Sequence, residues 1–201
     1  MIAHPLTLQG RLVRLEPLEA EHIPALMTVA TAHPETYRFT STPVTAEQAS
    51  AYFGRAFRER DERLAYPFVL LEEGSGRVVG SSRYSDIRWG HRNCELGYTW
   101  LHPEVQGGGV NVEAKLLMLG YAFEALDFLR VYFYTDTRNE HSQRAVRALG
   151  AKEEGVLRCH MVMKDGFVRD SLVFSVVHFE WPEVKAGLEA RLERKRAAQR
   201  G

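Results

Sequence analysis

Three consecutive glycines, Gly107–Gly109, stand between a predicted strand and a predicted amphipathic helix. Glycine carries no Cβ, so three in a row let the backbone approach a bound group closely. The first turn of a helix has backbone N–H groups without acceptors and carries a partial positive charge. A glycine-rich turn that opens a helix is therefore a suitable site for a phosphate or pyrophosphate.

Two well-known phosphate-binding patterns do not fit this turn. A P-loop needs Gly-Lys followed by Ser or Thr, and the sequence has no such triplet. A dinucleotide fingerprint that starts at Gly107 needs Gly or Ala at position 112, where the chain has Val112. The spacing alone leaves two interpretations open, an anion site or a glycine-rich connection that binds nothing.

The elements around the turn follow from the apolar pattern. Residues 94–101 before it predict a strand. After it, apolar residues recur at gaps of four, three, four and three, which places them on one face of a helix, at Val112, Leu116, Leu119, Phe123 and Leu126. A strand over 131–135 comes next. A second helix is predicted from Asn139 to Leu149, and Gly150 ends it.

The rest of the chain supplies more strands and two early helices. The helices are predicted over residues 19–31 and from Thr45 to about Arg63, with Thr45 as N-cap and Gln48 as its capping-box partner. The remaining predicted strands lie at residues 11–16, 66–71, 77–87, 156–163 and 168–179.

This order predicts one α/β (α+β) domain over residues 1–180. Strands gather in the middle of the chain, and later helices alternate with strands, which favours a mixed sheet of about seven strands with helices on both faces. No repeat or linker interrupts the pattern. Residues 181–201 are predicted to form a charged C-terminal helix or tail.

Composition limits the classes of partner. The 201 residues hold 26 Lys plus Arg and 26 Asp plus Glu, so the formal charge is zero and DNA is not an expected partner. Two distant cysteines give neither a disulfide framework nor a zinc site, and no His, Cys, Asp or Glu cluster has metal-site spacing. No signal peptide or run of about 20 apolar residues is visible, so a cytoplasmic location without membrane contact is predicted.

The segment Gln106–Asn111 resembles the acetyl-CoA motif of the GNAT superfamily, Gln/Arg-x-x-Gly-x-Gly/Ala, with Asn111 where Gly or Ala is usual. Further segments resemble the RimJ/RimL-like branch, which acetylates the N-termini of ribosomal proteins. These segments are Glu95–Leu101, Asn139–Ser142, Ala148–Ala151, Glu154–Arg158 and Asp165–Asp170. The resemblance implies the GNAT fold, in which a mostly antiparallel sheet is splayed at the strand before the glycines. It also implies acetyl-CoA as co-substrate and no metal.

The same resemblance implies a set of cofactor-binding residues. The backbone of Trp100 and Leu101 would bind the pantetheine arm like an added strand. N–H groups from Gly107 to Asn111 would bind the pyrophosphate. The full implied set is Trp100, Leu101, Gln106, Gly107, Gly108, Gly109, Val110, Asn111, Asn139 and Ser142.

Two residues are predicted to act in catalysis. Glu95 is the expected general base that takes a proton from the acceptor ammonium, directly or through water. The alternative is that Glu95 only forms an ordinary ion pair. Ser142 is the expected general acid or thiol-positioning group, because Val146 stands where many relatives have Tyr. Asn139, which would face the thioester, is alternatively a simple N-cap.

The expected reaction is acetyl transfer to a primary amine, of a small molecule or of a protein N-terminus. Tyr37, Trp89 and His160 are candidates to line the acceptor pocket. One alternative is a non-catalytic module that binds or senses CoA. Another is a nucleotide- or NAD-binding enzyme that uses the glycine turn.

The C-terminal segment raises a separate question. Val184, Leu188 and Leu192 form a thin apolar edge, which predicts a homodimer contact. Basic residues gather in the same segment, where they predict a solvated surface, at Arg191, Arg194, Lys195, Arg196 and Arg200.

Overall fold

The computed structural model describes residues 1–200 and the side chains of residues 1–198. Its core is one sheet in the order β1-β2-β3-β4-β5-β6-β8-β7. The strands are β1 (Leu8–Gln9), β2 (Val13–Pro17), β3 (Tyr66–Glu72), β4 (Val78–Arg88), β5 (Asn93–Leu101), β6 (Arg130–Asp136), β7 (Lys152–Val162) and β8 (Val168–Val177). All neighbours are antiparallel except β5 and β6. The predicted mixed sheet is confirmed, and the strand beyond the expected seven is the two-residue β1.

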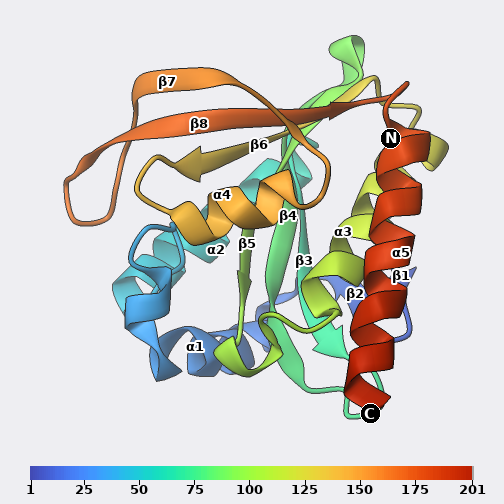
Figure 1. Ribbon diagram of the computed structural model, residues 1–201. Coiled ribbons are helices and arrows are strands. Elements are labelled where there is room, and N and C mark those ends of the chain that lie inside the picture. Colours follow the sequence, from blue (N-terminus) through green and yellow to red (C-terminus); the bar gives the residue numbers. More distant parts are fainter. Residues whose placement is uncertain (201) are drawn as a thin grey trace.

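Helices cover both faces of this sheet. On one face, α1 (Ile23–Ala32) and α2 (Ala46–Asp61) form an apolar cluster with Val69, Leu71 and Trp100. On the other, α3 (Val110–Gly120), α4 (Glu140–Arg147) and α5 (Trp181–Arg200) contribute to a larger cluster. Figure 1 shows α5 running beside α3 along one side of the molecule, with the β7–β8 hairpin extending toward the other side.

Side-chain caps fix where the helices begin. The hydroxyl of Thr45 accepts the N–H of Gln48 at 3.2 Å, as predicted. The Gln48 side chain accepts instead from the N–H of Val44, so the reciprocal bond lies one residue earlier than a capping box places it. Asn139 caps α4 by accepting the N–H of Ser142 at 3.0 Å.

The helix predicted over residues 112–126 is α-helical only to Gly120. Tyr121–Ala125 forms a π-helical turn, which spaces side chains more widely than an α-helical turn. Ala122 and Phe123 are both buried in this turn, and the Phe123 ring stacks on Trp181 at 5.5 Å between centroids. The wider turn thus fits the end of the helix to α5, which the local periodicity does not show.

Strands β5 and β6 pair over only three positions. The last pair joins Glu95 to Tyr132. Beyond it, β5 continues to Leu101 on β4, and β6 continues to Asp136 on β8. The sheet is therefore splayed at the strand before the glycines, as expected, and the edge of β5 from Leu96 onward has no strand partner on this side.

A bulge shapes β5 at the splay. Ser81 pairs with Trp100 and Arg83 with Gly97, so Tyr98 and Thr99 both stand opposite Ser82. Tyr98 has a φ of 52°, in the left-handed region. This conformation places the Tyr98 ring over the Arg83 guanidinium at 4.3 Å and the Thr99 hydroxyl 2.8 Å from that of Ser82.

The apolar edge of the C-terminal segment packs within the chain. Val184, Leu188 and Leu192 are buried against the core that α3 shares. The observation that suggested a homodimer is thus explained by intramolecular packing, and a dimer stays a prediction. The side chain of Arg200 lies outside the described residues. None of the helices in residues 1–200 combines the length and hydropathy needed to cross a membrane.

Candidate active site

A cavity of about 1420 Å³ opens where β5 and β6 separate. Its walls come from the α1–α2 connection, α2, β5, the glycine turn, α3, β6, α4, the β7–β8 hairpin and α5. The structure brings most of the predicted site residues to this one cavity, namely Glu95, Trp100, Leu101, Gln106, Gly107, Gly108, Asn111, Asn139 and Ser142.

The three glycines of the turn serve different purposes. Gly107 has a φ of 74° and open space where a Cβ would be, so it provides the turn itself. A Cβ on Gly109 would lie 2.4 Å from Leu12 Cδ1 and 3.1 Å from Leu192 Cδ1. Gly109 therefore allows close packing, and with the buried Val110 it offers a ligand only its backbone.

The first turn of α3 retains donors for an anion. Its first helical bond runs from the Glu113 N–H to the Gly109 carbonyl at 2.9 Å, which leaves the N–H groups of residues 110–112 without a helical acceptor. Asn111 is helical rather than left-handed, and its Oδ1 is buried with no partner among the described residues. Backbone and side-chain groups at this helix start thus fit a phosphate-bearing ligand.

Cations from α5 lie next to these donors. The ammonium group of Lys195 contacts the Gly107 carbonyl, and Arg191 donates to the Ala148 carbonyl at 2.8 Å. Both side chains line the cavity. The prediction of a solvated surface is therefore wrong for these two residues, because sequence periodicity does not show that α5 folds back over the glycine turn.

Glu95 occupies the point where the splay begins. Its carboxylate forms no ion pair with a side chain in the described part of the chain, so the ion-pair alternative finds no support. Burial raises the pKa of Glu95 to about 7, and the charge of Arg169 opposes this shift. A Cβ on Gly97 would lie 2.3 Å from Glu95 Oε1, so this glycine provides the room for the carboxylate.

Lys115 is a cavity residue that the sequence reasoning missed. It lies on α3, is only 5% exposed, and donates to Thr99 Oγ1 at 2.6 Å and Ser82 Oγ at 3.2 Å. Burial lowers the pKa of Lys115 to about 7, and the charge of Glu95 opposes this shift. A signal was present, because a lysine at position 115 interrupts the apolar stripe between Val112 and Leu119.

Ser142 and Asn139 lie at the start of α4, in the cavity wall. Asn139 acts as the N-cap, so the simpler interpretation of this residue is confirmed, although its place in the wall also leaves it accessible to a ligand. Val146 is buried in the core, so this position supplies no acid.

The candidates for the acceptor pocket divide. Tyr37 and His160 line the cavity, whereas Trp89 does not. The Trp89 indole N–H donates to the Arg63 carbonyl and the ring packs on Phe128, so this prediction was wrong. The Tyr37 hydroxyl donates to the Leu101 carbonyl at 2.8 Å, and Gln106 Nε2 donates to it at 2.9 Å. That carbonyl is therefore fully used, which the predicted role of Leu101 in binding pantetheine did not anticipate.

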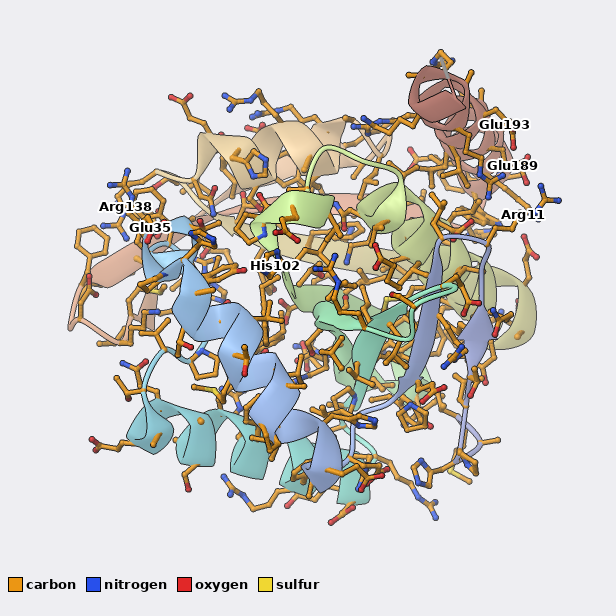
Figure 2. The ribbon with its side chains drawn as sticks, turned by 90° about the horizontal axis from the view of Figure 1, so that it is seen from below. Arg11, Glu35, His102, Arg138, Glu189 and Glu193 are labelled. Atoms are coloured by element: carbon orange, nitrogen blue, oxygen red, sulfur yellow. The ribbon has the colours of Figure 1, made fainter. Side chains whose placement is uncertain are left out.

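A bridge closes one end of the cavity, and we call it the roof. In the roof, the Arg138 guanidinium lies between the rings of Phe39 and Phe167, 4.9 and 3.5 Å from their centroids. Lys164 in the hairpin tip donates to the Thr42 carbonyl at 2.9 Å. Figure 2 shows Arg138 at the same edge of the molecule as Glu35 of the α1–α2 connection, another cavity-lining residue.

Similarity to known proteins and solved structures identifies the family. Residues 12–152 match the family model described as Acetyltransferase (GNAT) domain. The chain belongs to the GNAT acetyltransferase family. A GNAT structure from T. thermophilus, described as a "putative acetyltransferase", is 42% identical with a TM-score of 0.84, over 96% of this chain and 100% of that one.

Two further GNAT proteins bear on the branch. A Bacillus subtilis protein named "Putative ribosomal N-acetyltransferase YdaF" is 30% identical over 56% of this chain and 59% of its own length, so the match spans little more than half of that relative. Mycobacterium smegmatis RimJ in complex with CoA-disulfide shares the fold, at 21% identity and a TM-score of 0.78 over 94% of this chain and 95% of that one. The resemblance to the GNAT family and its RimJ/RimL-like members is thereby confirmed.

Among the described residues, no group of three or more His, Cys, Asp or Glu side chains lies close enough together to hold a metal ion.

Proposed function

We propose that this protein transfers an acetyl group from acetyl-CoA to a primary amine. The observation that carries the proposal is the cavity at the splay, which joins the glycine turn at the start of α3 to a buried carboxylate with a raised pKa. The names of the relatives support the same chemistry. A protein N-terminus belongs to the proposed acceptor class, and cytoplasmic action without a metal is part of the proposal.

Acetyl-CoA would supply an acyl group activated as a thioester. We assign its phosphate end to the N–H groups of residues 107–111 and to Arg191 and Lys195, which lie beside the turn. The open edge of β5 leading to Trp100 offers main-chain groups to the pantetheine arm. Asn139 and Ser142 lie on the opposite wall.

In the proposed reaction Glu95 accepts the proton that the acceptor ammonium must lose before its nitrogen can attack the thioester carbonyl. The C–N bond then forms while the C–S bond breaks, and the sulfur takes up a proton. Ser142 and Lys115 are the two cavity groups available to provide it. A pKa near 7 suits Glu95 to this task, because a base works best near its own pKa.

Titration calorimetry with acetyl-CoA, CoA, ATP and NAD tests the proposed donor. We expect acetyl-CoA and CoA to bind and ATP and NAD not to bind. Absence of acetyl-CoA binding would overturn the proposal. Binding of NAD or ATP in its place would favour the alternative of a nucleotide-binding enzyme.

Replacing Glu95 separates an enzyme from a CoA-binding module. We expect Glu95→Gln to lower kcat about 100-fold or more, since general-base catalysis contributes about that much, with an unchanged Kd for acetyl-CoA. In the wild type, kcat/KM should rise as the pH passes through about 7, where the Glu95 proton leaves, and the variant should lose this step. Glu59→Gln, which alters a cavity carboxylate already paired with Arg55, is the matched control for cavity charge. Equal turnover in Glu95→Gln and the wild type would exclude Glu95 as the base.

A further inference from the structure

Arg169 is a buried cation without a counter-ion. It lies on β8 in the cavity wall and is 6% exposed. Its Nε donates to the Ser171 hydroxyl at 2.8 Å, and within the described residues no carboxylate lies within ion-pair distance of it. A buried charge without a partner is unfavourable, so a ligand that brings a negative charge would satisfy it.

The acid nearest to Arg169 along the sheet is already engaged. Asp136 stands opposite Ser171 in the β6–β8 register. Its carboxylate accepts from Arg138 Nε at 3.0 Å, from Arg138 Nη2 at 2.7 Å and from the Arg138 backbone N–H at 2.8 Å. The Asp136 carboxylate is thus saturated by its own neighbour, which leaves Arg169 for another anion.

The guanidinium of Arg169 is held in a fixed orientation. Ser171 Oγ, which accepts from its Nε, is also 2.9 Å from His160 Nδ1, and the His160 ring lies 4.5 Å from that of Tyr134. No bond to the described residues uses the Nη1 and Nη2 groups of Arg169. An arginine held through Nε presents these two groups as the fork that binds a carboxylate in bidentate fashion.

Glu95 faces the same space as Arg169. Glu95 pairs with Tyr132, and alternate residues of β6 place Tyr132, Tyr134 and Asp136 on one face, opposite Ser175, Val173 and Ser171 of β8. Both charged side chains line the one cavity, and neither has an opposite charge in ion-pair contact within the described structure. The cavity therefore offers one unpaired carboxylate and one unpaired guanidinium to a single acceptor.

We propose that Arg169 binds a carboxylate of the acceptor whose amine reacts beside Glu95. This inference rests on the proposed acetyl transfer. It specifies an acceptor that carries both an amine and a carboxylate, as charge complementarity to Glu95 and Arg169 requires. Two sources provide this chemistry, the α-carboxylate of a free amino acid and an acidic side chain next to the N-terminus of a peptide.

A panel of matched acceptors tests the proposal and separates the two sources. Release of CoA from acetyl-CoA is measured with the twenty free L-amino acids and with their C-terminal amides. It is also measured with tripeptide amides that have glutamate or glutamine in the second position. We expect the preferred carboxylate-bearing acceptor to exceed its neutral counterpart about tenfold or more in kcat/KM, the discrimination typical of a charge-assisted bond. A preference among the amino acids identifies the first source, and one among the peptides identifies the second.

Variants of Arg169 link that preference to this side chain. Arg169→Met should remove the ratio between acid and amide, while Arg169→Lys, which keeps the charge but not the fork, should retain part of it. Arg38→Met is the control, because Arg38 lines the same cavity but is exposed. Calorimetric binding of acetyl-CoA verifies that each variant is folded.

The outcomes are distinguishable. Equal rates with acids and amides, or an unchanged ratio in Arg169→Met, would overturn the inference and leave acetyl transfer intact. Acetyl-CoA binding without turnover of any carboxylate-bearing acceptor would also overturn it. Failure of the wild type to bind acetyl-CoA would instead count against the proposed function itself.

Discussion

The ammonium group of Lys115 contacts two hydroxyls and, within the described residues, no carboxylate. Its low pKa has a consequence for stability whose sign follows from linkage. Because the pKa in the folded state is below the ordinary value of 10.5, the folded protein binds this proton less readily than the unfolded chain does. Stability is lost progressively as the pH falls from about 10 toward 7, and the full loss is present below about 7.

We expect Lys115→Met to be more stable than the wild type at pH 6, by about 2 to 4 kcal/mol, and the difference to shrink toward pH 10. The hydroxyls of Ser82 and Thr99 still bond each other in this variant, so no polar group is stranded. Urea unfolding at several pH values measures the effect. A difference that does not vary with pH would show that Lys115 is not desolvated in the folded state.

At the level of residues, the sequence predicts identity better than environment. The motif directs attention to Glu95 and the glycine turn, and all but Gly109 and Val110 of the predicted residues line the cavity. The lack of partners for Lys115 and Arg169 depends on which acids are already engaged elsewhere. That information arises only when β4, β6, β8 and α3 are assembled.

At the level of elements, Glu113 joins three segments that are distant in sequence. Its Oε2 accepts the N–H groups of Leu12 and Val13, at 2.6 and 3.0 Å, and its Oε1 accepts from Arg196 on α5 at 2.8 Å. Glu113 is buried beside the turn between β1 and β2, where Gly10 leaves space for the carboxylate. The helix that carries the proposed phosphate site is therefore anchored through one side chain.

We expect Glu113→Ala to lower the free energy of unfolding by about 2 to 4 kcal/mol, because it leaves two backbone donors and a half-buried cation without their acceptor. Chemical denaturation measures the loss. Glu193→Gln is the control, since Glu193 bonds the same Arg196 from the exposed side of α5, where Figure 2 labels it. The control should change stability by less than about 0.5 kcal/mol. Equal effects of the two variants would contradict the anchoring role.

Element boundaries show where local pattern stops being informative. Thr45 and Asn139 mark the starts of their helices correctly, because a cap bonds within three residues of itself. The end of α3 at Gly120 does not follow from its periodicity, because Trp181, far along the chain, packs on the turn that comes next. The two-residue β1 has too little sequence to carry a strand pattern.

At the level of the whole molecule, the roof closes the cavity by contacts that are separate from the sheet. Arg138 lies between Phe39 and Phe167, and so joins the α1–α2 connection to the hairpin tip. We expect Phe167→Ala to raise the KM of the acceptor about twofold to tenfold, the weight of one cation–π contact, without changing the Kd of acetyl-CoA. Steady-state kinetics, with amide hydrogen exchange over residues 37–42, measures both the affinity and the opening.

Phe179→Ala is the control for this substitution. Phe179 is 74% exposed and does not line the cavity, so its removal should alter neither the KM nor the exchange. Faster exchange over residues 37–42 in both variants, or in neither, would contradict closure by the roof.

The position of α5 over the glycine turn has a consequence for synthesis of the chain. Leu192 occupies the space beside Gly109, and Lys195 contacts the Gly107 carbonyl, yet both residues follow every strand of the sheet in chain order. A ribosome that has already made the whole sheet has not yet made the residues that finish the turn. A transcript truncated before codon 192 would therefore yield a polypeptide with its sheet complete and the packing of its glycine turn unfinished.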